Sequence, residues 1–172
     1  MPVDLRSDTV TRPTAAMRKA MMDAPLGDVC FGDDPTVLRL EALAAERLGK
    51  EAAIFVPTGS MSNQIGVALH TGLGDAALVE ADSHIANWEA AGAAASSGVQ
   101  LRTIATETGL PTVQQLEDAL WPLHPKAPRL KLPCMENTHN GHGGMPHPAA
   151  APPQPPPGAH PPRPPAPPPR AP

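Results

Sequence analysis

The chain has 172 residues, with 13 basic and 17 acidic side chains and a formal net charge of −4. This balance excludes the basic surface of a nucleic-acid-binding protein and the polybasic patch of a membrane-surface protein, so we expect neither partner. Proline, glycine or polar residues interrupt every apolar run well before the 18 residues that a transmembrane helix needs.

Helical and strand-like segments alternate from residue 1 to about 140, which predicts an α/β fold. Thr14 and Asp34 are suited to cap helices over residues 14–23 and 34–48. The second helix has an apolar stripe that we expect to be buried, made of Val37, Leu40, Leu43, Ala44 and Leu48.

The segments that follow fit strands joined by helices. Thr112 is suited to cap a helix to about Leu120, with Val113, Leu116 and Leu120 facing inward. We expect strands at Ala52–Val56, Ala76–Glu80, Val99–Ile104 and Leu130–Met135, and helices at 61–70, 86–96 and 112–120.

Proline changes the character of the last part of the chain. Fifteen of the 25 prolines lie in residues 146–172, and no Leu, Ile, Val, Phe or Trp follows Met145. We therefore expect a domain over 1–144 and a disordered proline-rich tail over 145–172. Pro165–Arg170 has the PxxPxR spacing of a ligand for an aromatic-lined groove, so a non-catalytic interaction protein is the alternative to an enzyme.

The two cysteines, Cys30 and Cys134, form no disulfide framework, and free thiols are typical of a reducing compartment. The first residues carry charged side chains and lack the apolar run of a signal peptide. Together these features lead us to expect a cytoplasmic protein.

Two predicted strands are followed by groups that suit a cofactor. The turn Pro57–Ser60 joins a strand to a helix, and its glycine and free N–H groups suit a phosphate, although an ordinary capped turn has the same pattern. His84 lies in a loop after a strand, where its ring could stack on an aromatic cofactor. A single loop histidine is more often a surface residue.

A third polar run, Glu136–Asn140, follows the last predicted strand. His139 titrates near neutral pH and could move a proton, while the alternative is a polar turn that leaves the sheet. Cys134, His139, His142 and His147 follow no structural zinc spacing, so we expect no metal.

Several motifs, in order over residues 3–144, together resemble the low-specificity threonine aldolases, which are fold-type I pyridoxal-phosphate enzymes. They are DLRSDTVTRP at Asp4–Pro13, GDDPT at Gly32–Thr36, GKEAA at Gly49–Ala53, FVPTGSMSNQ at Phe55–Gln64, EADSH at Glu80–His84 and ENTHN at Glu136–Asn140.

The resemblance implies an incomplete three-layer α/β sheet of the fold-type I (aminotransferase-like) large domain and pyridoxal 5′-phosphate as the cofactor. It also implies a lyase activity of threonine catabolism and glycine biosynthesis. That activity is the retro-aldol cleavage of L-threonine or L-allo-threonine to glycine and acetaldehyde, in a homo-oligomer.

Carried over by motif, Gly59 and Ser60 would bind the cofactor phosphate, with Ser60 in place of the usual Thr. His84 would stack on the pyridine ring and take part in catalysis. Ser7 would bind the substrate carboxylate, and His139 would lie near the substrate hydroxyl. Whether a histidine or a water takes the hydroxyl proton stays open. Phe31 stands on the substrate side where the family usually has Tyr.

Later elements of the family pattern have no counterpart in these residues. They are the Asp that pairs with the pyridine nitrogen, the Lys that binds the cofactor, and the arginines for phosphate and carboxylate. Lys126 and Lys131 lie in the wrong context, and Pro133 interrupts an expected central strand. We therefore expect a truncated aldolase-like domain that is inactive alone, or one that docks onto an intact subunit.

Overall fold

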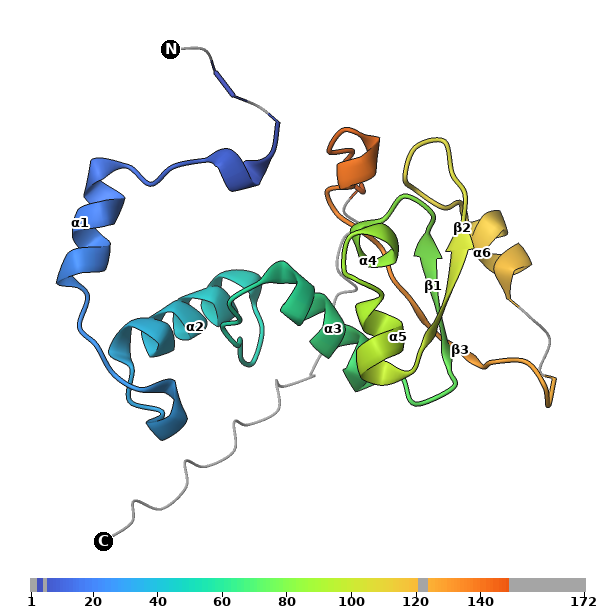
Figure 1. Ribbon diagram of the computed structural model, residues 1–172, viewed down its shortest axis with the longest axis horizontal. Helices are drawn as coiled ribbons and strands as arrows, with labels where there is room; N and C mark the ends of the chain where they lie inside the picture. Colours follow the sequence, from blue (N-terminus) through green and yellow to red (C-terminus); the bar gives the residue numbers. More distant parts are fainter. Residues whose placement is uncertain (1–2, 5, 121–123, 149–172) are drawn as a thin grey trace, which may run out of the picture. The chain divides into compact units, whose positions relative to one another are not determined.

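A computed structural model describes residues 3–4, 6–120 and 124–148. These residues divide into two compact units, the first ending at Phe55 and the second beginning at Val56 (Figure 1). The expected tail lies outside the described residues from residue 149 onward, as does its PxxPxR segment. Across the described part of the chain, no helix is both long enough and apolar enough to span a membrane.

The first unit contains two α-helices and two short 3₁₀ turns. Both predicted caps are confirmed, because the Thr14 hydroxyl accepts the Met17 N–H and the Asp34 carboxylate accepts the Thr36 and Val37 N–H groups. The elements are a 3₁₀ turn at Asp8–Val10, α1 at Ala15–Asp23, a 3₁₀ turn at Val29–Phe31 and α2 at Pro35–Leu48.

The apolar stripe of α2 is less buried than predicted. Leu40, Leu43 and Leu48 are exposed, while Val37 and Ala44 are half-buried. Periodicity determines which side chains share a helix face, but burial also needs a surface to pack against. Among the described residues of this unit, only Ala45 is buried, so that surface is small.

The predicted strand at Ala52–Val56 is wrong. These residues pair with no strand of the described chain, and Ile54 keeps 75 % of its surface exposed. The N–H of Phe55 donates instead to the Glu41 carboxylate at 2.7 Å. An apolar run becomes a strand only where a neighbouring strand completes its backbone hydrogen bonds.

The second unit is built on a parallel sheet with the order β2-β1-β3. Every residue of the central strand β1 is buried, and helices α3 and α5 pack together beside the sheet around a core of Val67, Ala77, Ala93 and Val99 (Figure 1). The α/β fold class is thus confirmed. The elements are α3 at Gly59–His70, β1 at Ala76–Glu80, α4 at His84–Asn87, α5 at Gly92–Ser97, β2 at Gln100–Ile104, α6 at Val113–Ala119 and β3 at Leu130–Pro133.

The single helix predicted over residues 86–96 is instead two helices. Between α4 and α5, Ala90 and Ala91 adopt φ angles of 50° and 56°. L-residues rarely adopt this left-handed conformation, which costs about 1 kcal/mol per residue or more and interrupts a helix. An alanine-rich composition favours a helix, but the packing around residue 89 overrides it.

Helix α6 begins as predicted and buries a different side chain. Thr112 caps it in a reciprocal pair of hydrogen bonds with Gln115. Val113 and Leu120, expected inward, are exposed, and Ala119 is buried instead.

Strand β3 borders only β1 within the described sheet, so Pro133 lies in an edge strand rather than a central one. The next residue, Cys134, donates its N–H to the Leu78 carbonyl at 2.8 Å, and the contact with β1 therefore continues past the proline.

An ion pair joins the beginnings of β1 and β3. The N–H of Gly72 donates to the buried Asp75 carboxylate at 2.9 Å, and the Arg129 side chain reaches the same carboxylate at 3.2 Å. The Gly72 hydrogen bond lowers the pKa of Asp75, burial raises it, and Arg129 with Lys131 lowers it again, so the pKa lies below its usual value.

We predict that Asp75→Asn lowers the free energy of unfolding at pH 7, because the variant loses the carboxylate that accepts the Gly72 N–H and pairs with Arg129. Because folding lowers the Asp75 pKa, this stability is complete above the unfolded value of about 3.9 and is lost as pH falls through the folded value. Urea denaturation of both proteins from pH 7 to pH 3 measures it. An equal difference at both ends of the series would contradict the assignment.

Candidate active site

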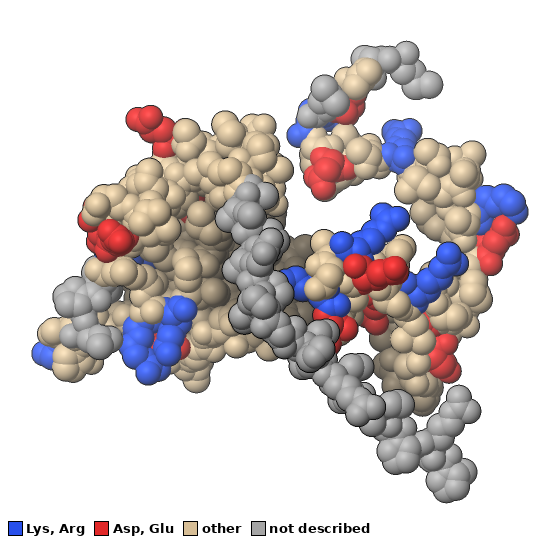
Figure 2. All heavy atoms as spheres, turned by 180° about the vertical axis from the view of Figure 1, so that it is seen from behind, with Lys and Arg blue, Asp and Glu red and all other residues tan. Residues whose placement is uncertain are grey.

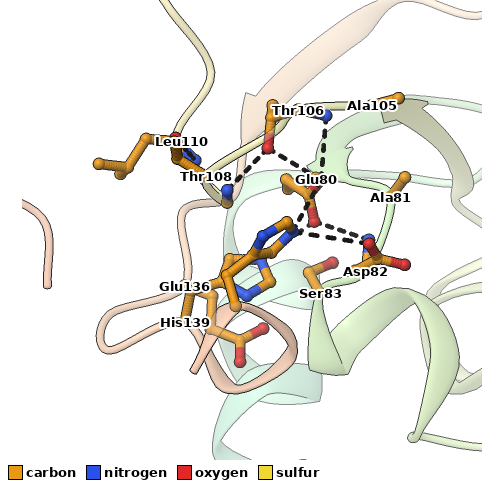
Figure 3. Close-up of polar contacts among 12 residues, drawn as sticks. Glu80, Ala81, Asp82, Ser83, Ala105, Thr106, Thr108, Leu110, Glu136 and His139 are labelled. Carbon is orange, nitrogen blue, oxygen red and sulfur yellow. Dashed lines mark hydrogen bonds and ion pairs between the residues drawn. The ribbon is translucent and has the colours of Figure 1, made fainter. Parts of the chain in front are cut away.

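The carboxyl ends of the three parallel strands bring together loops that are far apart in sequence. β1 leads into Asp82–His84, β2 leads to Thr106, and β3 leads into Glu136–Asn140. Figure 3 shows Asp82, Thr106 and His139, one residue from each of these segments, in contact with Glu80. Ligands commonly bind at this edge of an α/β sheet.

Glu80 is the last residue of β1, and its carboxylate is almost fully buried. One oxygen accepts the Asp82 N–H at 2.6 Å, and the other accepts the hydroxyl and the N–H of Thr106 at 3.1 and 3.3 Å. Burial raises the pKa of Glu80, but these hydrogen bonds and the nearby His139 and His142 lower it more. The net pKa lies below its usual value, so the group is a carboxylate at neutral pH.

His139 is fully buried beside this carboxylate. Its Nε2 lies 3.0 Å from a Glu80 oxygen, and its ring packs edge-on against His142. Gly109 covers another side of the ring, where an added Cβ would lie 2.7 Å from it. The main chain of His139 forms an antiparallel bridge with Met145.

A second buried carboxylate, that of Glu89, holds His84. It accepts the side-chain amides of Asn63 and Gln64 from α3 at 2.5 and 2.7 Å, and Nδ1 of His84 lies 2.8 Å from it. The turn after Glu89 contains the left-handed Ala90 and Ala91, so the backbone strain lies next to this contact. The sequence offered a signal for Glu89 in the two amides of the Phe55–Gln64 motif, which need a buried acceptor.

His84 is thereby fixed at two points. Its N–H donates to the Glu136 carboxylate at 2.5 Å, and its ring is held by Glu89. A carboxylate at Nδ1 keeps the proton on that nitrogen and leaves the Nε2 lone pair free. The side chain remains 41 % exposed, which leaves one part of the ring accessible.

A cavity of about 570 Å³ lies between α3, His84 and the residues after β3. This volume is in the range of small-molecule and cofactor sites, roughly 300–1,000 Å³. Gly59, Asn63, Cys134 and Glu136 are among its lining residues, and no lysine or arginine lines it within the described chain. Burial raises the pKa of Cys134, so its thiol is neutral.

The N-terminus of α3 opens beside this cavity. Thr58 caps the Met61 N–H, whereas the N–H groups of Gly59 and Ser60 take part in no hydrogen bond among the described residues. An added Cβ at Gly59 would meet nothing within 4 Å, so an anion can approach the backbone closely. Ser60 is half-buried next to Gly59 but does not line the cavity.

The structure therefore brings Gly59 and His84 to one cavity, with Ser60 adjacent. His139 does not line it. Ser7 and Phe31 belong to the first unit, where both are exposed, and the Ser7 hydroxyl accepts the Thr9 N–H at 3.2 Å. The cavity suits a flat ring with a phosphate, because it combines an accessible imidazole with a free helix N-terminus. The amino group that would bind such a cofactor covalently is not among its lining residues.

Sequence comparison agrees with this geometry, since the beta-eliminating lyase family matches residues 4–152. The chain belongs to this family. Its N-terminal residues are 45 % identical over 140 residues to the low specificity L-threonine aldolase of Escherichia coli strain K12, covering 81 % of this chain and 42 % of the relative. A probable low-specificity L-threonine aldolase 2 from Arabidopsis thaliana is 45 % identical over 148 residues, covering 83 % of this chain and 41 % of the relative.

A further relative, the alanine racemase TOXG of Cochliobolus carbonum, is 37 % identical over 107 residues, covering 62 % of this chain and 28 % of the relative. The residues shared by these proteins thus occur in relatives named for different reactions. The chain spans about two fifths of the length of the two threonine aldolases.

We predict that Glu89→Gln lowers the free energy of unfolding by about 1–3 kcal/mol, because an amide replaces an acceptor that three donors share. It should also release the His84 ring, so that the proton moves from Nδ1 toward Nε2. Nitrogen-15 NMR of the imidazole at pH 8 reports the tautomer. The exposed Glu107→Gln is the matched control and should leave both measurements unchanged. An unchanged His84 tautomer in Glu89→Gln would contradict the positioning role.

Proposed function

We propose that this chain supplies the phosphate-binding and ring-stacking part of a pyridoxal-phosphate-dependent lyase of the threonine aldolase type. The observation that carries the proposal is a cavity with a free helix N-terminus and a histidine held in place by a buried carboxylate. The 45 % identity to threonine aldolases supports the reaction class.

The phosphate is assigned to the N-terminus of α3. The N–H groups of Gly59 and Ser60 donate to phosphate oxygens, and the helix dipole favours the negative charge. The Ser60 hydroxyl provides a further donor, as the Thr at this position would in the wider family. The absence of a Cβ at Gly59 allows the oxygens to reach the backbone.

His84 is assigned to the face of the cofactor ring. Glu89 and Glu136 fix its ring and backbone, so stacking requires little further ordering of the side chain. Its Nε2, the ring nitrogen not held by Glu89, is the atom proposed to accept a proton from a hydroxyl or from a bound water. When bound, pyridoxal phosphate supplies the electron sink that stabilises the charge left at Cα as the Cα–Cβ bond breaks.

His139 is assigned a supporting role rather than the contact with the substrate hydroxyl that the resemblance implies. Its ring is fully buried on Glu80 and lines no part of the cavity. From that place it holds the loop that carries Glu136, whose carboxylate binds the His84 N–H. Loss of His139 would therefore act on His84 indirectly.

Threonine or allo-threonine is the substrate that we propose, because two relatives at 45 % identity are named as low-specificity L-threonine aldolases. The β-hydroxyl of such a substrate needs a proton acceptor, which His84 offers. Ser7 and Phe31 are proposed substrate contacts, for the carboxylate and the side chain respectively. The exposed apolar residues of α1 and α2, such as Met21 and Leu40, suit contacts within a homo-oligomer.

We predict that pyridoxine 5′-phosphate binds the chain and that His84→Ala weakens its binding about two- to tenfold, the value of one aromatic stacking contact. This analogue has an alcohol in place of the aldehyde, so it cannot form imines with surface lysines. Equilibrium dialysis or quenching of the analogue's fluorescence measures the affinity. His124→Ala is the matched control and should bind normally, because His124 does not line the cavity. Equal affinities for wild type and His84→Ala would refute the stacking assignment.

We also predict that a polypeptide of residues 1–172, expressed alone, forms no acetaldehyde from threonine in the presence of excess pyridoxal phosphate. No lysine among the described residues lines the cavity, so this part of the chain offers no amino group there to hold the cofactor covalently. A coupled alcohol dehydrogenase assay measures acetaldehyde. Turnover that disappears in His84→Ala would show that these residues contain a complete site.

A further inference from the structure

A second group of side chains lies outside the cavity lining, between the end of β1 and the loop that follows β3. Glu80, His139 and His142 each point one potential ligand atom toward the others, and all three atoms lie within 4.8 Å of one another. Glu80 and His139 are buried, and the side chain of His142 is only 15 % exposed. The carboxylate of Asp82 lies at the outer side of this group, 3.5 Å from His142 Nε2.

Hydrogen bonding accounts for only part of this arrangement. His139 Nε2 lies 3.0 Å from one Glu80 oxygen, whereas His142 Nε2 lies 3.7 Å from the other. The His142 nitrogen is buried and has no hydrogen-bond partner among the described residues, although it faces two carboxylates. Leaving a buried nitrogen unpaired costs about 1–3 kcal/mol, so the position calls for an additional partner.

The spacing of these atoms fits one small cation. Two ligands of a tetrahedral ion with bonds of about 2.0–2.1 Å are about 3.3 Å apart. Two Glu80 oxygens lie 3.0 and 3.7 Å from the Nε2 atoms of His139 and His142, and an Asp82 oxygen lies 3.5 Å from His142 Nε2, so these three separations are close to that value. The carboxylates of Glu80 and Asp82 also bring two negative charges close to the two imidazoles, and a divalent ion neutralises them.

The backbone holds the two histidines on one side of a tight turn. His139 precedes the 3₁₀ turn Asn140–His142, and this spacing of three residues brings the rings to 4.7 Å between centroids. Gly141 allows the turn to approach β1's loop, since an added Cβ would lie 2.9 Å from the Asp82 carbonyl. The bridge between His139 and Met145 closes the loop.

We propose that Glu80, His139 and His142 bind a divalent transition metal of the zinc type, with Asp82 as the fourth ligand. Imidazole nitrogens with carboxylate oxygens suit zinc better than magnesium or calcium, which prefer oxygen alone. The ion joins the end of β1 to the loop 139–145, and thereby stabilises the loops that hold His84. This differs from the sequence-based expectation of no metal, because Glu80 and Asp82 are distant in sequence from the histidines.

The test uses the untagged full chain, treated with a chelator and then dialysed. Competition with a chromophoric chelator should show one Zn²⁺ bound per chain, and Co²⁺ should give the ligand-field absorption of a tetrahedral site. Mg²⁺ should not compete. His142→Ala should weaken Zn²⁺ binding at least tenfold, and Asp82→Asn should weaken it less, because Asp82 is largely exposed.

Two control variants distinguish this site from other ligand combinations. His147→Ala and Cys134→Ser remove neighbouring ligand types and should bind Zn²⁺ as the wild type does. Zn²⁺ should also raise the melting temperature of the wild type and of both controls, but not that of His142→Ala. Circular dichroism checks that His142→Ala is folded, and Asp82→Asn serves in its place if it is not. Absence of saturable 1:1 binding would overturn the proposal, as would undiminished binding by His142→Ala or a loss in either control.

Discussion

The candidate site depends on a carboxylate buried at the end of the central strand. Strand β1 is covered by helices and by its neighbouring strands, so its last residue, Glu80, ends inside the protein rather than in solvent. A buried charge must be hydrogen-bonded or paired to persist. Glu80 meets this requirement through the loops that follow each of the three strands, because it contacts Asp82, Thr106 and His139 (Figure 3). The carboxylate thereby fixes the edge of the sheet where the cavity opens.

Glu89 is a second buried carboxylate that is stabilised by hydrogen bonds, and it holds the His84 ring. Its buried carboxylate joins α3 to the segment between α4 and α5, and the strained backbone at Ala90 and Ala91 accompanies that placement. The two buried carboxylates thus have different tasks. Glu80 organises the loops that surround His139, whereas Glu89 orients the imidazole that faces the cavity. Both accept hydrogen bonds from more than one segment of the chain.

The second unit has broad uncharged areas on its surface. Seen from behind, much of this surface carries no charged side chain, with small groups of charges between the neutral areas (Figure 2). Leu69, Leu73 and Trp88 are exposed in the second unit, as are apolar residues of α1 and α2 in the first unit. Exposed apolar side chains are available for contacts with another part of a protein or with a second subunit. The relatives, which are more than twice as long as the matched region, have further sequence available for such contacts.

Local sequence determined the helix starts, the turn glycines and most of the second unit's strands. The caps at Thr14, Asp34 and Thr112 depend on side chains within three residues of the groups they satisfy, and they could therefore be predicted. The motifs, which occur in the order typical of the family, predicted the family. The resemblance in turn predicted that Gly59 and His84 lie at one site. Tertiary structure alone decided the burial of α2, the missing strand at Ala52–Val56 and the break near Ala90, because each depends on a packing partner. It also decided the position of His139 and the roles of Glu80 and Glu89, since hydrogen bonds across 26 to 59 residues leave no periodic trace in the sequence.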